Sequence, residues 1–333
     1  MTRLPVPKIL RLFLLLMALL LPLGARPYHL SLAIEVMAFA IFAMSLDLLL
    51  GYTGLPSFGH AAFFGLGAYT VAYLSSNHPL AWGLTANLLI LLPVVVLVTA
   101  VTALIIGFFA LRTSGVYFLM ITLAFAQMLF SVAIRWTAVT GGSDGLPGIP
   151  APVITLGPLH LLINSREAYY FLVLAFFILV YWLLRRLVNS PFGWTLRGIR
   201  ENEARMQALG YATYRYKMAV FVVAGVFAGL GGMLLALFFR HASPENLYWT
   251  ISGQVLVMVI IGGAGTLTGP VLGALLVRLF PQIASSYLDR WEAIEGIIFI
   301  LFVLFAPRGI WGIWHTMRPD RSGRPVRSEK GIS

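Results

Sequence analysis

Long apolar runs separated by short polar stretches make up most of the chain. We find nine such runs, near residues 9–23, 30–50, 60–75, 86–110, 115–134, 168–187, 218–239, 252–277 and 293–306. Many approach the ~20 residues that a helix needs to cross a ~30 Å hydrocarbon core. Unbroken runs predict helices, because the strands of a membrane barrel alternate in polarity over ~10 residues. The pattern therefore predicts an all-α polytopic membrane protein with about 8–10 transmembrane helices.

Composition supports this class. Hydrophobic residues make up 59% and charged residues 11% of the 333 residues, whereas a soluble domain carries roughly 25% charged residues. The first run, preceded by Lys8 and Arg11, has two interpretations: a secretory signal or an uncleaved first helix. We favour the helix, because a chain with many spans needs no removable signal.

The net charge of +11 is concentrated in loops and at the C-terminal end. Basic residues in loops beside membrane spans mark the cytoplasmic side. They predict cytoplasmic N- and C-termini, a cytoplasmic loop at 188–216 and an external loop at 138–167. Because topology accounts for the positive charge, we expect no nucleic-acid partner. We divide the chain into a transmembrane permease domain, 1–311, and a basic cytoplasmic tail, 312–333.

Two glycine-rich interruptions fall within apolar sequence, one in each half of the chain. The first is Gly51–His60 and the second is Gly262–Thr266. A turn at the second would bring the C-terminus back to the cytoplasmic side, as would an additional span that the pattern does not reveal. Paired breaks are typical of inverted-repeat transporters, whose broken helices form the solute path near mid-membrane. We predict broken or re-entrant segments here, with pathway candidates Ser57, Gly59, His60, Gly262, Gly263 and Gly265.

Close helix packing is the alternative explanation for these glycines. The pairs Gly225/Gly229, Gly265/Gly269 and Gly269/Gly273 have the small-xxx-small spacing that lets helices approach. We favour the pathway for the two clusters taken together, where free half-helix amides would suit a solute carboxylate.

Ionisable residues within the apolar sequence also have two interpretations. Glu35 and Asp47 either line a polar path or pair locally near an interface. His60 either relays protons or bonds its own bent backbone, and we favour the second.

The segment 190–210 is a charged island in an apolar chain. Ser190-Pro191 is a good helix start and Gly210 a good stop. Between them an apolar face is predicted from residues at three- and four-residue spacing: Leu196, Ile199, Glu203, Met206 and Leu209. Because Gly193 and Gly198 disfavour helix, we expect the regular helix to begin near Ile199. The mixed charges of Arg200–Glu203 favour docking on a soluble partner over binding to a lipid surface.

Motifs for chemistry are scarce. A phosphate-binding loop needs Gly-Lys followed by Ser or Thr. None of the three lysines, Lys8, Lys217 and Lys330, is preceded by glycine. Gly141–Gly145 matches the nucleophile-elbow pattern, but it lies between spans rather than in an α/β sheet. We therefore expect no enzyme activity, no cofactor and no metal.

Several sequence blocks carry a resemblance to a known family. They are Gly51–Tyr69, Gly115–Ala126, Thr140–Leu146, Ser190–Gly193, Ile199–Glu203, Ser243–Glu245 and Gly262–Pro270. Their order and number resemble the LivM-type permease subunit of branched-chain amino acid ABC importers, over nearly the whole chain except the basic tail.

The resemblance implies a multi-pass permease of the bacterial inner membrane that works by alternating access. Its partners would be a second, LivH-like permease subunit, two cytoplasmic ATPase subunits and an extracytoplasmic solute-binding protein, all within membrane lipid. It implies that 190–210 is the coupling element that docks on an ATPase, with Arg200, Glu201, Asn202 and Glu203 as coupling residues. Trp194 departs from the arginine expected there.

The substrate and the energy source are less well defined. The family also includes transporters of other amino acids and of urea or short amides. The alternative function is an ion-coupled secondary transporter or channel for a small polar solute, which would use His60, Asp47 or Glu35 for ions.

Overall fold

The computed structural model describes residues 26–156 and 159–285, together with single residues at 22, 293, 296, 297, 299, 300 and 309. Within this part the chain is mostly helical, with two short strand pairs, which confirms the predicted all-α membrane class. Seven of the nine predicted runs form helices close to their expected bounds. The other two, 9–23 and 293–306, lie outside the described residues apart from a few single positions, and the tail 312–333 lies wholly outside them.

Five described helices are long and apolar enough to cross a membrane: α2 (Pro27–Thr53), α4 (Leu88–Ala110), α5 (Val116–Arg135), α7 (Arg166–Val188) and α10 (Thr213–Phe239). α3 (His60–Ser75) is shorter. The run at 252–277 forms two short apolar helices, α11 (Trp249–Gly262) and α12 (Thr268–Ala284). The predicted break in this run is therefore confirmed.

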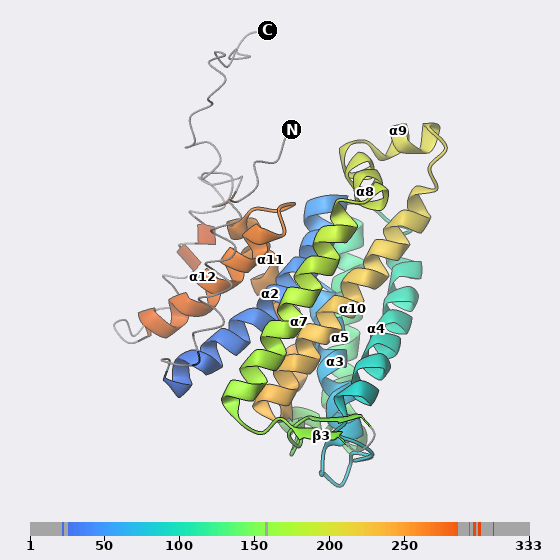
Figure 1. Cartoon of the computed structure of the whole chain (residues 1–333). Helices are drawn as coiled ribbons and strands as arrows, with labels where there is room; N and C mark the ends of the chain where they lie inside the picture. Colours follow the sequence, from blue (N-terminus) through green and yellow to red (C-terminus); the bar gives the residue numbers. More distant parts are fainter. Residues whose placement is uncertain are drawn as a thin grey trace, which may run out of the picture.

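Helices α2 and α10 form the centre of the bundle. α10 packs against α2, α3 and α4, while α11 and α12 pack against α2. In Figure 1 the α11–α12 pair stands on one side of α2, and α4 stands on the other side of the bundle. Outer helices present large apolar side chains, such as Leu97 on α4, which is 63% exposed. Such a surface suits lipid better than water.

Close backbone packing explains several glycines of the central helices. A methyl group on Gly225 would lie 2.9 Å from Cβ of Ala103 on α4, and one on Gly229 would overlap Thr99. Gly232 lies directly against the Phe64 carbonyl of α3. The packing role predicted for the Gly225/Gly229 pair is thus confirmed, since side chains here would push α10 away from α3 and α4.

Two short helices lie at one end of the bundle and the strands at the other (Figure 1). The helices are α8 (Pro191–Glu201) and α9 (Glu203–Ala208). At the opposite end, β2 (Val153–Leu156) and β3 (Leu159–Leu162) form an antiparallel hairpin. We call these the α8 end and the strand end.

A second strand pair joins distant segments at the strand end. β1 (Leu146–Pro147) follows α5, the short helix α6 (Thr137–Thr140) and the 3₁₀ turn η1 (Gly142–Asp144). It pairs antiparallel with β4 (His241–Ala242), which directly follows α10. Ser76, just after α3, donates its hydroxyl to the Pro147 carbonyl at 2.5 Å. The 3₁₀ turn η2 (Pro244–Leu247) then leads into α11.

Candidate functional site

Helix α8 begins where the sequence predicted. Ser190 caps it, with the hydroxyl accepting a hydrogen bond from the Gly193 amide at 3.4 Å, and Pro191 is the first helical residue. The helix does not begin near Ile199, as we had expected from Gly193 and Gly198. Gly193 lies against the Val188 backbone and Gly198 lies against Met206 of α9, so these glycines allow close packing in an intact helix.

The segment 190–210 is divided into two helices, not one. Asn202 is extended (φ −160°, ψ 97°) and caps α9, with its side-chain oxygen accepting from the Arg205 amide at 2.9 Å. Asparagine favours such caps because its side chain competes with the helical backbone bond. The predicted apolar face is correct for Leu196 and Ile199, which are buried, and wrong for Leu209, which is 66% exposed.

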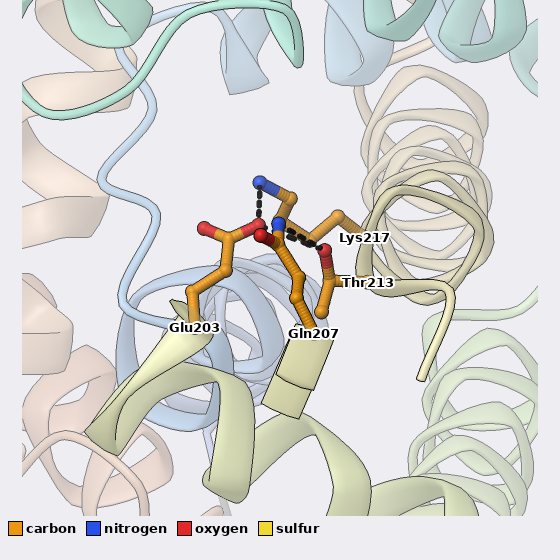
Figure 2. Close-up of polar contacts among 4 residues, drawn as sticks. All are labelled: Glu203, Gln207, Thr213 and Lys217. Carbon is orange, nitrogen blue, oxygen red and sulfur yellow. Dashed lines mark hydrogen bonds and ion pairs between the residues drawn. The ribbon is translucent and has the colours of Figure 1, made fainter. Parts of the chain in front are cut away.

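A small polar cluster holds α9 against the start of α10, as Figure 2 shows. The Glu203 carboxylate lies 2.6 Å from Lys217 Nζ and accepts a hydrogen bond from the Thr213 hydroxyl at 3.0 Å. The Gln207 amide donates to the same hydroxyl at 3.1 Å. Lys217 is largely buried, with 9% of its side chain exposed. Glu203 therefore makes contacts within the chain, where the sequence predicted a coupling residue.

The outward surface of α8 carries Trp194 and Glu201. Trp194 is 64% exposed, and its ring lies 4.8 Å from the Arg197 guanidinium carbon. Glu201 is exposed at the end of α8 and has no hydrogen bond or ion pair within residues 26–156 and 159–285. These two side chains are free to contact another molecule.

Arg200 points the other way, toward the first glycine break. Its Nη1 donates a hydrogen bond to the Gly51 carbonyl in the last turn of α2. Its Cγ would lie 3.2 Å from a methyl group on Gly54, the αL residue that ends α2 (φ 76°). Arg200 is exposed apart from this contact, which no short stretch of sequence indicates because its partner lies 149 residues away.

Asp47 connects the two breaks. Its side chain is fully buried in α2. Its carboxylate accepts a hydrogen bond from the Gly265 amide at 2.6 Å and one from the Leu267 amide at 3.1 Å. The alternative of local partners for Asp47 and Glu35 is therefore wrong. Glu35 instead pairs with Arg278 of α12 at 3.1 Å, a residue that the sequence reasoning missed although it is a lone charge in an apolar run.

The two glycine breaks therefore meet in space. A side chain at Gly51 would overlap both the Gly265 backbone and the Asp47 carboxylate. Because α2 has 27 residues, it is about 40 Å long and can cross the whole hydrocarbon core. Gly51 and Gly54 thus lie at the α8 end of this helix.

The remainder of the first break returns into the bundle. His60 begins α3, and its Nε2 lies 3.0 Å from the Ser45 hydroxyl. Since Ser45 is eight residues before the end of α2, His60 lies about 12 Å below that end. Non-helical backbone at such depth has to be enclosed by protein or line a cavity. Residues 55, 57 and 59 are buried accordingly.

His60 is enclosed by protein contacts. Its ring stacks on Phe42 with centroids 5.7 Å apart, and it is fully buried. The preference for a bond to its own backbone is wrong, since the side-chain partner is Ser45. Nδ1 has no hydrogen-bond partner among the described residues.

Serine hydroxyls accept hydrogen bonds from backbone amides at the start of α3. Ser57 accepts from the Gly59 amide at 3.2 Å and Ser252 of α11 accepts from the Ala61 amide at 2.7 Å. Gly59 lies directly against the Thr122 carbonyl of α5. Two of the amides that we expected to be free for a solute carboxylate are therefore already bonded.

The second break is a tight turn between α11 and α12. Gly263 and Gly265 have positive φ values of 109° and 83°, which suit glycine. Gly262 packs directly on the Gly269 carbonyl, so this pair of small residues closes the hairpin. Of the six pathway candidates, Gly265 contacts the first break; Ser57, Gly59 and His60 lie deeper. Within the described ranges no cluster of side chains is suited to holding a metal ion.

Comparison with known proteins gives one family. Residues 28–306 match the family described as branched-chain amino acid transport system / permease component. The LivM high-affinity branched-chain amino acid permease proteins of Escherichia coli and Salmonella typhimurium are each 29% identical over 300 residues, covering 82% of this chain and 69% of theirs. The NupC nucleoside ABC transporter permease of Lactococcus lactis is 31% identical over 116 residues, covering 34% of this chain and 35% of its own. No solved structure matches.

Proposed function

Because the chain belongs to the branched-chain amino acid transport system permease family, we propose that it moves a branched-chain amino acid across the bacterial inner membrane, driven by separate ATPase subunits. It is a membrane-spanning permease component. The observation that carries the proposal is the position of α8. Its outer surface exposes Trp194 and Glu201, while Arg200 on the same helix contacts the first glycine break.

The α8 end is where we propose that ATPase subunits dock. The basic residues around 185–217 predict that this end faces the cytoplasm, and with it both termini and the basic tail 312–333. A short exposed helix pair with an aromatic anchor fits helix-in-groove docking on a soluble protein. Hydrolysis of ATP is assigned to the partners, since the sequence has no phosphate-binding loop.

The remaining partners follow from the same assignment. A second, LivH-like permease subunit would complete the membrane part, and an extracytoplasmic solute-binding protein would deliver the solute to the strand end. Exposed apolar side chains on α4, α5 and α7 are left for lipid or for the second permease.

The four predicted coupling residues divide into different roles in this proposal. Glu201 contacts the ATPase, and Trp194 joins it as an additional contact. Asn202 and Glu203 hold α9 in place through their contacts within the chain. Arg200 transmits movement to the membrane helices. Ser57, Gly59 and His60 remain pathway candidates on the re-entrant segment, and Gly262, Gly263 and Gly265 form the turn that moves.

The proposed substrate class follows the relatives that cover most of the chain. Those relatives are named for branched-chain amino acids, whereas the nucleoside permease matches about a third of this chain. Competition for uptake between leucine and a nucleoside distinguishes the two classes.

The test is purification of the tagged complex from native membranes, followed by leucine uptake in proteoliposomes. We expect ATPase subunits to be recovered with the chain, and uptake to require ATP. Glu201→Lys should reduce ATPase recovery about tenfold or more, because reversal of an interface charge costs several kcal/mol.

A matched charge reversal controls for non-specific effects. Glu167 is an exposed glutamate in the first turn of α7 at the strand end, and Glu167→Lys should leave ATPase recovery unchanged. Isolation of the chain alone, with uptake that stops on addition of an uncoupler and continues without ATP, would contradict the proposal and support an ion-coupled transporter.

A further inference from the structure

Three segments that are far apart in the sequence meet at one point of the α8 end. They are the last turn of α2 around Gly51, the α11–α12 turn around Gly265, and the C-terminal turn of α8 at Arg200. Gly51 and Gly265 are in backbone contact, and the Arg200 guanidinium lies beside both. A methyl group on Gly265 would lie 3.3 Å from Arg200 Nη1.

Asp47 fixes the α11–α12 turn to α2 by two hydrogen bonds. Each carboxylate oxygen takes one backbone amide, Gly265 N at 2.6 Å and Leu267 N at 3.1 Å. These bonds are enclosed by protein, since Asp47 is fully buried. The bonds hold a strained turn, because Leu267 has a positive φ of 58° that is unfavourable for a residue with a side chain. Loss of the bonds would therefore allow the turn to relax.

Arg200 connects the same junction to α8. Its partner is a backbone carbonyl one helical turn beyond Asp47. Leu196, one turn away on α8, and the adjacent Ile199 are buried, and α8 packs against α2. Any displacement of α8 therefore acts on Gly51 through Arg200, and Gly51 has no side chain to separate it from Gly265.

We propose that Arg200 and Asp47 form a latch that transmits movement of α8 to the α11–α12 hairpin, so that this hairpin is the element that moves during transport. The inference rests on the proposed function, since it names the path by which ATPase movement reaches the membrane helices. Arg200 is a positioning residue in this scheme: it pulls on the α2 end, and Asp47 passes the displacement to the turn.

The test uses spin labels in a chain that contains no cysteine of its own. Labels are placed at Ala264, exposed in the α11–α12 turn, and at Ser114, exposed in the α4–α5 connection. In the full complex, the distance between them should change when ATP is bound. Arg200→Ala should remove most of this change and lower leucine uptake about tenfold or more, while ATPase subunits stay bound and hydrolyse ATP.

Two further variants separate the latch from a loss of folding. Arg200→Lys keeps the charge and one donor, so we expect partial uptake and a partial distance change. Asp47→Asn removes one acceptor, so we expect a more mobile label at Ala264 even in the isolated chain. Arg186→Ala removes an exposed arginine of α7 that lies over Trp182, and it should leave both distance and uptake unchanged.

The outcomes distinguish the two proposals. An unaltered ATP-dependent distance change in Arg200→Ala, with unaltered label mobility in Asp47→Asn, would overturn the latch and leave the docking of ATPases intact. Loss of ATPase subunits from the unmodified complex would overturn the proposed function. The label mobility of the isolated chain would still report whether Asp47 holds the turn.

Discussion

The two helices of the segment 190–210, α8 and α9, have different surroundings. α8 packs on the bundle with Leu196 and Ile199 buried, and it is continuous despite two glycines. α9 has no buried residue and is held by the Glu203 cluster and one cap. Burial stabilises the first helix, whereas local polar contacts stabilise the second, since six residues are too few for an independent helix.

The largest expected difference is between two leucines. Leu196→Ala removes a fully buried side chain of α8 and should lower the free energy of unfolding by about 2–5 kcal/mol. Leu209→Ala, at the exposed end of α9, should change it by no more than about 0.5 kcal/mol. Thermal unfolding of the detergent-solubilised chain measures both. Similar costs for the two would show that α9 is buried as α8 is.

A smaller effect is expected from Lys217→Met. This change leaves Glu203 without its ion pair and should favour local opening of α9 by about 1–2 kcal/mol, which corresponds to about five- to thirtyfold more cleavage. Limited trypsin digestion at Arg205 measures it. The exchanged pair, Glu203→Lys with Lys217→Glu, should restore resistance. Persistent cleavage in the exchanged pair would mean that packing of the lysine stem holds α9.

The smallest effect is expected from the two caps. Ser190→Ala and Asn202→Ala each remove a side-chain acceptor and should cost about 1 kcal/mol locally. We expect α8 to persist without its cap because its buried face remains, and α9 to lose amide protection. The measurement is hydrogen exchange at the Arg205 amide, which donates a hydrogen bond to the Asn202 side chain. Equal loss of amide protection in both helices would contradict the conclusion that burial stabilises α8 while polar contacts stabilise α9.

Local signals in the sequence were sufficient for part of this arrangement. Ser190-Pro191 marked the start of α8, and Gly262–Thr266 marked the turn between α11 and α12. In each case the residue that determines the conformation lies in the element that it shapes. The division at Asn202 was missed, although asparagine followed by Glu203 is itself a helix-start signal.

Long-range partners were not predictable in the same way. Asp47 and Glu35 were recognised as costly charges in an apolar run, but their partners lie 220 and 243 positions away, at Leu267 and Arg278. Which elements become neighbours depends on how the whole bundle packs, and one sequence does not contain that information in any short window. The direction of Arg200 was missed for the same reason.

The pairing of β1 with β4 limits how the strand end can deform. It joins the segments that follow α5 and α10, and the hydrogen bond from the Ser76 hydroxyl joins the end of α3 to β1. These three helices therefore share a common rigid rim, which cannot widen without rupture of the ladder. Along the chain, η2 joins that rim to α11, and α11 also packs against α3 and α5. Backbone pairing and helix packing therefore both resist separation of α3, α5, α10 and α11 at the strand end.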